Sequence, residues 1–218
     1  MVDVQTHKLP GGWTGSFLSE CWKLLKENYI LVFVPSFIVT VVALMFAYLG
    51  AIGAVIAGVL GVLLLSGQTR IYFALLNGEK KEIPEMFTPL SDPKLFKALA
   101  PLIVWKAISG ILVALAPGFT SVLLDVIGNL LVLFSNQLIT VRGIDFFDTL
   151  KLNFDALGKA WLDIIVFGFV ILGLAIAGTL ALVFPLVLIV MPLISLMWVR
   201  IYKEIFHSSS SMNVQITI

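Results

Sequence analysis

The sequence predicts an all-α integral membrane protein in which six transmembrane helices form three hairpins. Of the 218 residues, 60% are hydrophobic and only 12% are charged, and the mean hydropathy is +1.06. A soluble domain carries about 25% charged residues, so this chain has too few charges to cover its surface in water. The apolar runs are continuous, without the alternation of barrel strands, which favours helices.

Three long apolar blocks contain the predicted spans. The first block, residues 29–76, is too long for one crossing, because a helix needs about 20 residues to span a bilayer. Each block is therefore divided at a turn that contains glycine or proline. The predicted spans are residues 29–49 and 51–70, residues 99–116 and 119–138, and the two parts of residues 162–202 on either side of Phe184–Pro185.

Two segments that precede hairpins carry apolar side chains at helical spacing. These side chains are Phe17, Leu18, Cys21, Trp22 and Leu25 in residues 16–28, and Phe146, Phe147, Leu150, Phe154 and Leu157 in residues 145–159. The pattern predicts amphipathic helices on the cytoplasmic membrane interface, which orient the hairpins or dock a soluble partner. The middle counterpart, residues 83–95, contains three prolines and is expected to be partly loop. We expect Cys21 to be a packed thiol.

The basic residues predict the orientation in the membrane. Thirteen of the 14 Lys and Arg residues lie before, between or after the predicted hairpins, and the turns within the hairpins contain none. The positive-inside rule then places both termini and both long links in the cytoplasm. We therefore expect a multi-pass protein of the cell membrane, in contact with its lipids.

The chain also shows signs of internal repetition. Arg70-Ile71-Tyr72 closes the first predicted hairpin, and Arg200-Ile201-Tyr202 closes the third. We predict a single membrane domain, residues 1–218, with three repeats over residues 14–76, 82–140 and 145–206. Since Arg and Tyr are favoured where a helix leaves the membrane, Arg70, Tyr72, Arg200 and Tyr202 are expected at the cytoplasmic rim.

The start of the chain resembles a known group of membrane proteins. Residues 17–35 read FLSECWKLLKENYILVFVP, an amphipathic segment that leads through Leu-Leu-Lys-x-Asn into a proline-containing span. Residues 143–152, GIDFFDTLKL, resemble the glycine-led linker of the same group. The group includes the uncharacterised archaeal and bacterial DUF4013 family and the membrane domain attached to some glycerophosphodiester phosphodiesterases. The resemblance implies a six-helix membrane module without recorded chemistry, and no phosphodiesterase activity is carried over.

Lys106 and Asp125 are the charged residues placed deepest in the predicted spans. Lys106 lies 11 residues before Pro117, and Asp125 lies 7 residues after Gly118. A lone charge at the bilayer centre costs about 2.5–3.5 kcal/mol on insertion scales, so we predict an ion pair between them that faces the bundle interior. It would form a substrate, ion or proton path, or a structural clamp. The remaining alternative is a snorkelling Lys106 beside an unpaired, protonated Asp125.

Further polar residues follow in the same predicted span. Asp125, Asn129 and Asn136 are spaced at i, i+4 and i+11, so a continuous helix would place them on one face. This makes the span a candidate for the bundle centre. The side-chain amides of Asn129 and Asn136 then form hydrogen bonds with neighbouring helices or line a hydrated path.

No constellation of residues predicts an enzyme, a metal site or a cofactor. The two histidines, His7 and His207, lie in polar tails, and no metalloprotease, nucleotide-binding or hydrolase motif occurs. The aspartates near the third hairpin are interpreted as solvated faces, and Asp163 as a first-turn carboxylate: they are Asp145, Asp148, Asp155 and Asp163. The net charge of +1 excludes a case for nucleic acid.

Three functional classes follow from these observations. The first is a non-catalytic membrane module, either an accessory or scaffold subunit or a lipid-contacting protein. The second is a small-molecule or ion transporter or channel that uses the Lys106–Asp125 region. A lipid-active enzyme is the third. The expected partners are membrane lipids, other membrane subunits or a second copy of the chain.

Overall fold

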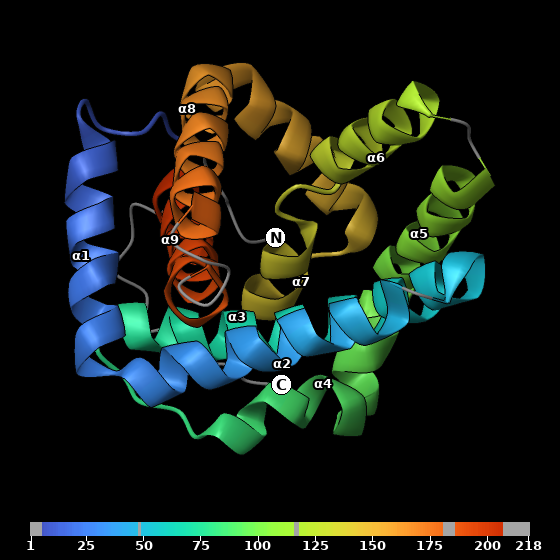
Figure 1. Ribbon diagram of the computed structural model, residues 1–218, viewed down its shortest axis with the longest axis horizontal. Helices are drawn as coiled ribbons and strands as arrows, with labels where there is room; N and C mark the ends of the chain where they lie inside the picture. Colours follow the sequence, from blue (N-terminus) through green and yellow to red (C-terminus); the bar gives the residue numbers. More distant parts are fainter. Residues whose placement is uncertain (1–5, 48, 116–117, 181–185, 207–218) are drawn as a thin grey trace. The chain divides into compact units, whose positions relative to one another are not determined.

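The computed structural model of the protein describes residues 6–47, 49–115, 118–180 and 186–206 (Figure 1). This part of the chain is helical and contains no β-strand. Within it, five helical segments have the length and apolar composition needed to cross a membrane: Tyr29–Phe46, Val55–Leu76, Pro93–Leu112, Leu123–Arg142 and Phe146–Thr179. The prediction of a helical protein with several apolar helices is thus confirmed.

The number of six spans stays a prediction. The sixth expected span includes residues 181–185, which lie outside the described residues. After them come the π-helix η2, Leu186–Val190, and α9, Met191–Ile205. At 15 residues α9 is shorter than the about 20 that a crossing requires.

The chain forms two compact units, and each unit combines segments that are distant in the sequence. Of the described residues, unit 1 contains 6–37, 71–83, 154–180 and 186–206. Unit 2 contains residues 38–70 and 84–153.

In unit 1, α1 (Trp13–Glu27) lies along α9 (Figure 1). The buried side of α1 consists of Trp13, Phe17, Cys21 and Leu25, one residue per helical turn. The Trp13 ring also contacts Phe167 of α8, with 6.3 Å between ring centroids. The predicted amphipathic helix is confirmed, and Cys21 is buried as expected. α1 ends at Asn28, and α2 continues from Tyr29 to Ala47 through an internal Pro35.

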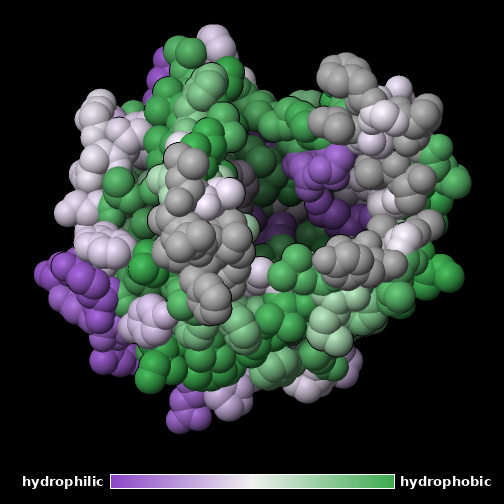
Figure 2. Space-filling model, viewed as in Figure 1, coloured by the Kyte–Doolittle hydropathy of each residue, from purple (hydrophilic) through white to green (hydrophobic). Residues whose placement is uncertain are grey.

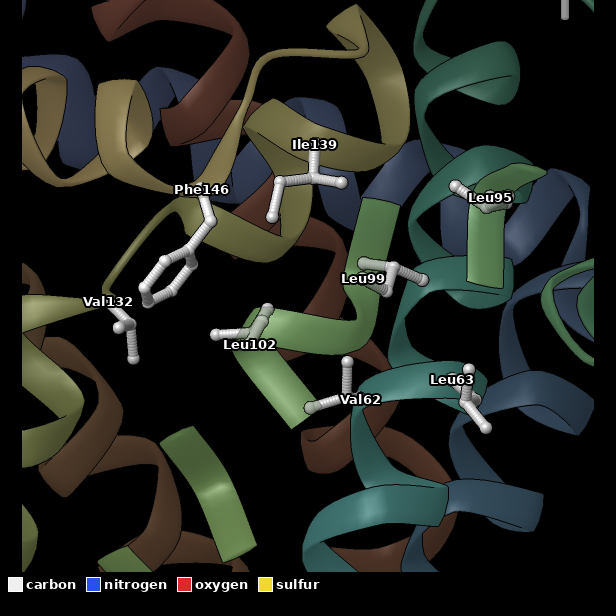
Figure 3. Packing of buried hydrophobic residues seen from close by; sticks show 8 residues of the cluster. All are labelled: Val62, Leu63, Leu95, Leu99, Leu102, Val132, Ile139 and Phe146. Carbon is white, nitrogen blue, oxygen red and sulfur yellow. The ribbon is translucent and has the colours of Figure 1, made fainter. Parts of the chain in front are cut away.

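In unit 2, the core lies between α3 (Gly50–Leu76), α5 (Pro93–Leu115) and α7 (Ser135–Arg142). Figure 3 shows the buried side chains: Val62, Leu63, Leu95, Leu99, Leu102, Val132, Ile139 and Phe146. Between α3 and α5 come a 3₁₀ helix, η1 (Ile83–Phe87), and the short α4 (Thr88–Ser91). The residues predicted to be partly loop thus form two short helical turns. Their proline content prevents one longer helix.

The predicted span 119–138 is wrong as a single helix. α6 (Phe119–Leu131) ends before a turn, and α7 begins at Ser135. This break contains neither glycine nor proline. It is possible because the Asn153 side chain takes over backbone hydrogen bonds there: Oδ1 accepts from Phe134 N at 2.9 Å, and Nδ2 approaches the Leu131 carbonyl at 3.4 Å. A polar side chain can replace helical bonds in an apolar setting in this way.

The predicted amphipathic helix 145–159 is continuous with the next span. Together they form α8 (Phe146–Leu180), which carries a non-helical residue at Ala160, with φ −119° and ψ 24°. Of the predicted apolar stripe, Phe147 and Phe154 are 72% and 57% exposed, and its place on a membrane interface stays a prediction. Thr149 and Asn153 are buried instead. They turn inward because the break between α6 and α7 needs hydrogen-bonding partners.

Candidate functional site

The candidate site is a hydrogen-bonded chain of three side chains on α5 and α6. The Lys106 ammonium donates to the Asn129 side-chain oxygen. The Asn129 amide nitrogen in turn donates to Asp125 Oδ1 at 2.8 Å and to the Asp125 carbonyl at 2.7 Å. The predicted direct ion pair between Lys106 and Asp125 is therefore wrong for this structure. Asn129 lies between the two charges, because its i+4 position places it one turn further along α6.

Close packing of α5 against α6 fixes the register of this chain. Trp105 Nε1 donates to the Gly128 carbonyl at 3.2 Å, one residue away from the Lys106–Asn129 contact. A Cβ atom at Gly128 would lie 3.0 Å from the Ser109 hydroxyl, so the two helices approach closely at this glycine. These contacts of Trp105 and Gly128 pack α5 tightly against α6 next to the chain of polar side chains.

Asp125 is exposed and lies one helical turn before Asn129 on the same side of α6. Its neighbours there are apolar and also exposed: Leu123, Leu124, Val126 and Ile127. Figure 2 shows a patch of hydrophilic surface on this face of the molecule, next to hydrophobic surface. The expectation that Asp125 faces the interior of a membrane-embedded bundle stays a prediction. The described residues supply a partner for Oδ1 of its carboxylate and none for Oδ2.

Asn136 belongs to a different network, on α7. Its amide nitrogen donates to the Val62 carbonyl at 3.0 Å, and its oxygen accepts from the Thr140 hydroxyl at 3.1 Å. The Thr140 hydroxyl also lies 2.5 Å from the Ser66 hydroxyl of α3. The predicted common face of Asp125, Asn129 and Asn136 is wrong, because the helix breaks between the last two. Asn136 joins α7 to α3.

A second buried network stabilises the break between α6 and α7. The Ser135 hydroxyl accepts from Thr149 Oγ1 at 3.0 Å and from Asn153 Nδ2 at 2.8 Å. All three side chains are at most 1% exposed. Sequence analysis missed Thr149 and Asn153. They recur at four-residue spacing on α8, but among the charged residues Asp148, Lys151 and Asp155 this spacing was not a distinct signal.

The two Arg-Ile-Tyr segments place their tyrosines in the interior. Tyr72 is fully buried, and its hydroxyl donates to the Val32 carbonyl and lies 2.7 Å from Ser36 Oγ. Tyr202 is also fully buried, with its ring 6.2 Å from that of Phe73. Both tyrosines are thus buried, and their expected place at the cytoplasmic rim stays a prediction. Because the ring area is large, both contribute mainly to the packing of unit 1.

Arg200 is held by two carboxylates and an aromatic ring. Nε contacts Glu20 at 2.8 Å, and Nη1 contacts Glu204 at 2.7 Å. The guanidinium carbon lies 4.1 Å from the centre of the Phe17 ring. Arg200 therefore joins α9 to α1. Arg70, its counterpart on α3, lies in a different environment, since its Nε and Nη1 atoms are buried without an acceptor among the described residues.

Two α8 aspartates bind the N-terminal segment. Asp163 accepts from Trp13 Nε1 at 3.0 Å and from the Leu9 amide at 3.3 Å. Asp155 accepts from the hydroxyl of Thr6 and from Lys159. Asp155 is exposed, as the sequence predicts, and Asp163 lies three residues after the non-helical Ala160; both also accept hydrogen bonds from the segment before α1. The chain that precedes α1 lies against α8 and supplies donors to both.

The described residues contain no group of three or more His, Cys, Asp or Glu side chains placed to bind a metal ion. Comparison with known protein families, with curated proteins and with solved structures finds no match.

Proposed function

We propose that the chain is a non-catalytic, multi-pass membrane module that serves as an accessory or scaffold subunit and assembles through the outer face of α6. The observation that carries this proposal is the exposed carboxylate of Asp125 within an apolar helix surface. An ionisable side chain facing lipid near the bilayer centre costs about 2.5–3.5 kcal/mol. A donor from a neighbouring membrane helix would remove that penalty, because it would occupy the free carboxylate oxygen.

The internal networks support the same proposal. The polar side chains at the break between α6 and α7 are bonded to one another or to the backbone, which makes them structural. Within the described residues, the α5–α6 chain ends in the exposed carboxylate of Asp125. The resemblance of residues 17–35 to six-helix membrane modules also supports a scaffold role, and we extend the proposal to a cell-membrane protein with cytoplasmic termini.

Native mass spectrometry of protein extracted in a mild detergent tests the proposal. We expect wild-type protein to retain a stoichiometric partner chain or a second copy, and Asp125→Leu to lose it. Asp148→Leu is the matched control, because Asp148 is exposed on α8 and pairs with Lys151 at 2.9 Å. Equal complexes in wild-type protein and Asp125→Leu would contradict assembly through Asp125.

A transporter or channel is the second candidate, and the polar chain from Lys106 through Asn129 to Asp125 favours it. Such a chain would line a hydrated path if water reached Asn129. Labelling of Asn129→Cys with a membrane-impermeant thiol reagent distinguishes the two functions. Reaction at this position would support a hydrated path, whereas a dry helix contact would remain unlabelled.

A further inference from the structure

The side of α5 that faces away from the core of unit 2 carries its charged and apolar residues in separate zones. Leu95, Leu99 and Leu102 are buried in that core, so the opposite side of the helix faces outward. Exposed apolar residues follow one another on the outward side from the middle of α5 to its end: Val104, Ile108, Leu112 and Leu115. Lys94 and Lys97 lie on the same side, in the first two turns, and are exposed. The outward side of α5 thus changes from cationic to apolar along its length.

A helix that enters a membrane shows this order of residues. The segment Pro93–Leu112 has the length and apolar composition to cross a bilayer, and both lysines lie near its start. At a rise of about 1.5 Å per residue, Lys97 is only about 6 Å from the first residue of the helix. Long lysine side chains near a helix end reach the headgroup layer, where their charge stays hydrated. Lys94 and Lys97 therefore mark the headgroup level at this end of α5.

The two short turns that lead into α5 expose apolar side chains beside these lysines (Figure 1). Phe87 of η1 is 41% exposed, and Leu90 of α4 is 50% exposed. Met86 and Pro89, next to them in the chain, are buried. A Cβ atom at Gly67 of α3 would lie 1.8 Å from the Met86 carbonyl oxygen, so η1 is pressed directly against α3. The two exposed side chains are thus presented outward from a firmly packed base.

The nearby carboxylates are engaged within the chain. Asp92 Oδ1 accepts from the Lys94 amide at 2.9 Å and from the Leu95 amide at 3.4 Å, so it binds the first turn of α5. A carboxylate in this place is stabilised by the positive end of the helix dipole. Glu85 of η1 is half-buried and has an interaction of its own within the chain. The exposed charges of the first α5 turns are therefore the two ammonium groups, which complement an anionic surface.

We propose that η1, α4 and the first two turns of α5 form a docking surface for anionic phospholipids of the surrounding leaflet. Lys94 and Lys97 contact the headgroup phosphates, and Phe87 and Leu90 insert among the upper parts of the acyl chains. Two cations above apolar side chains select lipids whose headgroup carries a net negative charge. The proposal rests on the membrane location given under the proposed function, and it does not depend on assembly through α6.

Lipid retention tests the selection by charge. The protein is reconstituted in vesicles of equal parts phosphatidylglycerol and phosphatidylcholine, released in a mild detergent and measured by native mass spectrometry. We expect wild-type protein to retain phosphatidylglycerol in preference to phosphatidylcholine. Lys94→Gln/Lys97→Gln should lower this preference by at least about fivefold, the contribution of one lysine near an anionic surface. Lys94→Arg/Lys97→Arg keeps both charges and should keep the preference.

Lys151→Gln/Lys159→Gln is the matched control, because it removes the same charge from two lysines that are also exposed. These lysines are paired on α8 with Asp148 at 2.9 Å and with Asp155 at 2.8 Å, so they offer little net charge to a lipid. The control should change the preference by less than about twofold. An equal loss in both double variants overturns the proposal, since retention would then follow the total charge of the protein.

A nitroxide label at Leu90 tests the insertion of the apolar side chains. It is attached to Leu90→Cys in a Cys21→Ala background, in bilayers of the same lipid mixture. Collision with oxygen, which concentrates in hydrocarbon, should exceed collision with a water-soluble nickel complex. A label at Glu82, an exposed residue before η1, is the control and should show the reverse.

The outcomes separate this proposal from the proposed function. If the protein stays in the membrane during alkaline extraction while the Leu90 label collides mainly with nickel, lipid docking is overturned and the membrane module stands. A Leu90 label shielded from both reagents would show a protein contact at this place and would also overturn lipid docking. Release of wild-type protein by alkaline extraction would overturn the membrane module itself.

Discussion

Replacing Asn153 by Ala should destabilise unit 2 strongly, although the substitution removes only a small polar group. In the folded protein, Asn153 Oδ1 accepts from the Phe134 amide at 2.9 Å, and Nδ2 donates to Ser135 Oγ at 2.8 Å. A third contact, to the Leu131 carbonyl, is long at 3.4 Å and contributes less. The loss therefore amounts to two good hydrogen bonds.

The magnitude follows from what remains after the substitution. Each neutral hydrogen bond contributes about 0.5–1.5 kcal/mol net, and a buried donor left without an acceptor costs about 1–3 kcal/mol. Asn153→Ala removes both good bonds and leaves the Phe134 amide without its acceptor in a buried place. Because these contributions overlap, we expect the free energy of unfolding to fall by about 2–4 kcal/mol.

Reversible unfolding in mixed micelles, followed by circular dichroism, measures this change. Asn77→Ala is the control, since Asn77 is exposed just after α3, and it should change the free energy by less than about 0.5 kcal/mol. If the two variants unfold alike, the break between α6 and α7 does not depend on Asn153, and the explanation given for it is refuted.

Three further experiments test other contacts. Gly67→Ala would place a Cβ atom 1.8 Å from a backbone oxygen and should lower the free energy of unfolding by about 2 kcal/mol or more. Gly61→Ala, with nothing within 4 Å of the added Cβ atom, should raise it by about 0.5–1 kcal/mol in the same unfolding assay. Equal effects of the two substitutions would contradict the close packing at Gly67. Burial raises the pKa of the Cys21 thiol to about 12, so little of it is thiolate at pH 7.5. Maleimide should therefore label folded protein at least about 100-fold more slowly than unfolded protein. Equal labelling rates would refute the buried position of Cys21. Trp13→Phe and Asp163→Asn should be non-additive by at least about 0.5 kcal/mol in a double-mutant cycle, because Trp13 Nε1 lies 3.0 Å from Asp163 Oδ1; simple additivity would show that the contact contributes nothing.

Much of the helical architecture could be predicted from apolar run length and turn residues. The sequence predicts spans at residues 29–49 and 51–70, and the structure has helices Tyr29–Ala47 and Gly50–Leu76. The turn between them was predictable because Gly50 adopts a positive φ of 59° there, which favours glycine. α5 begins earlier than predicted because residues 93–98 are amphipathic. α3 continues past Arg70, the charge at which the predicted span ended, through the apolar residues 71–76.

The break between α6 and α7 could not be predicted from its own residues. Residues 132–134 are Val, Leu and Phe, which carry no turn signal. The partner that makes the break possible, Asn153, lies 19 residues later, counted from Phe134. A local pattern cannot reveal such a long-range replacement of helical hydrogen bonds.

The sequence predicted which residues form the candidate site, but not which of them contact one another. Depth along the spans identified Lys106 and Asp125, and helical spacing placed Asn129 beside Asp125. Hydropathy does not show which residues of α6 are exposed, so the exposure of Asp125 was not predicted. The same is true of Asp163, whose partner Trp13 is 150 residues away in the sequence.

Photo-crosslinking in native membranes tests the central claim, assembly through the outer face of α6, most directly. A photoreactive residue at Ile127, which is 47% exposed beside Asp125, should crosslink to a discrete protein band. The same residue at Phe169 of α8, which is 70% exposed, is the control and should crosslink mainly to lipid. A band at position 127 that disappears with Asp125→Leu is the result we predict. Lipid adducts alone at both positions would contradict assembly through α6.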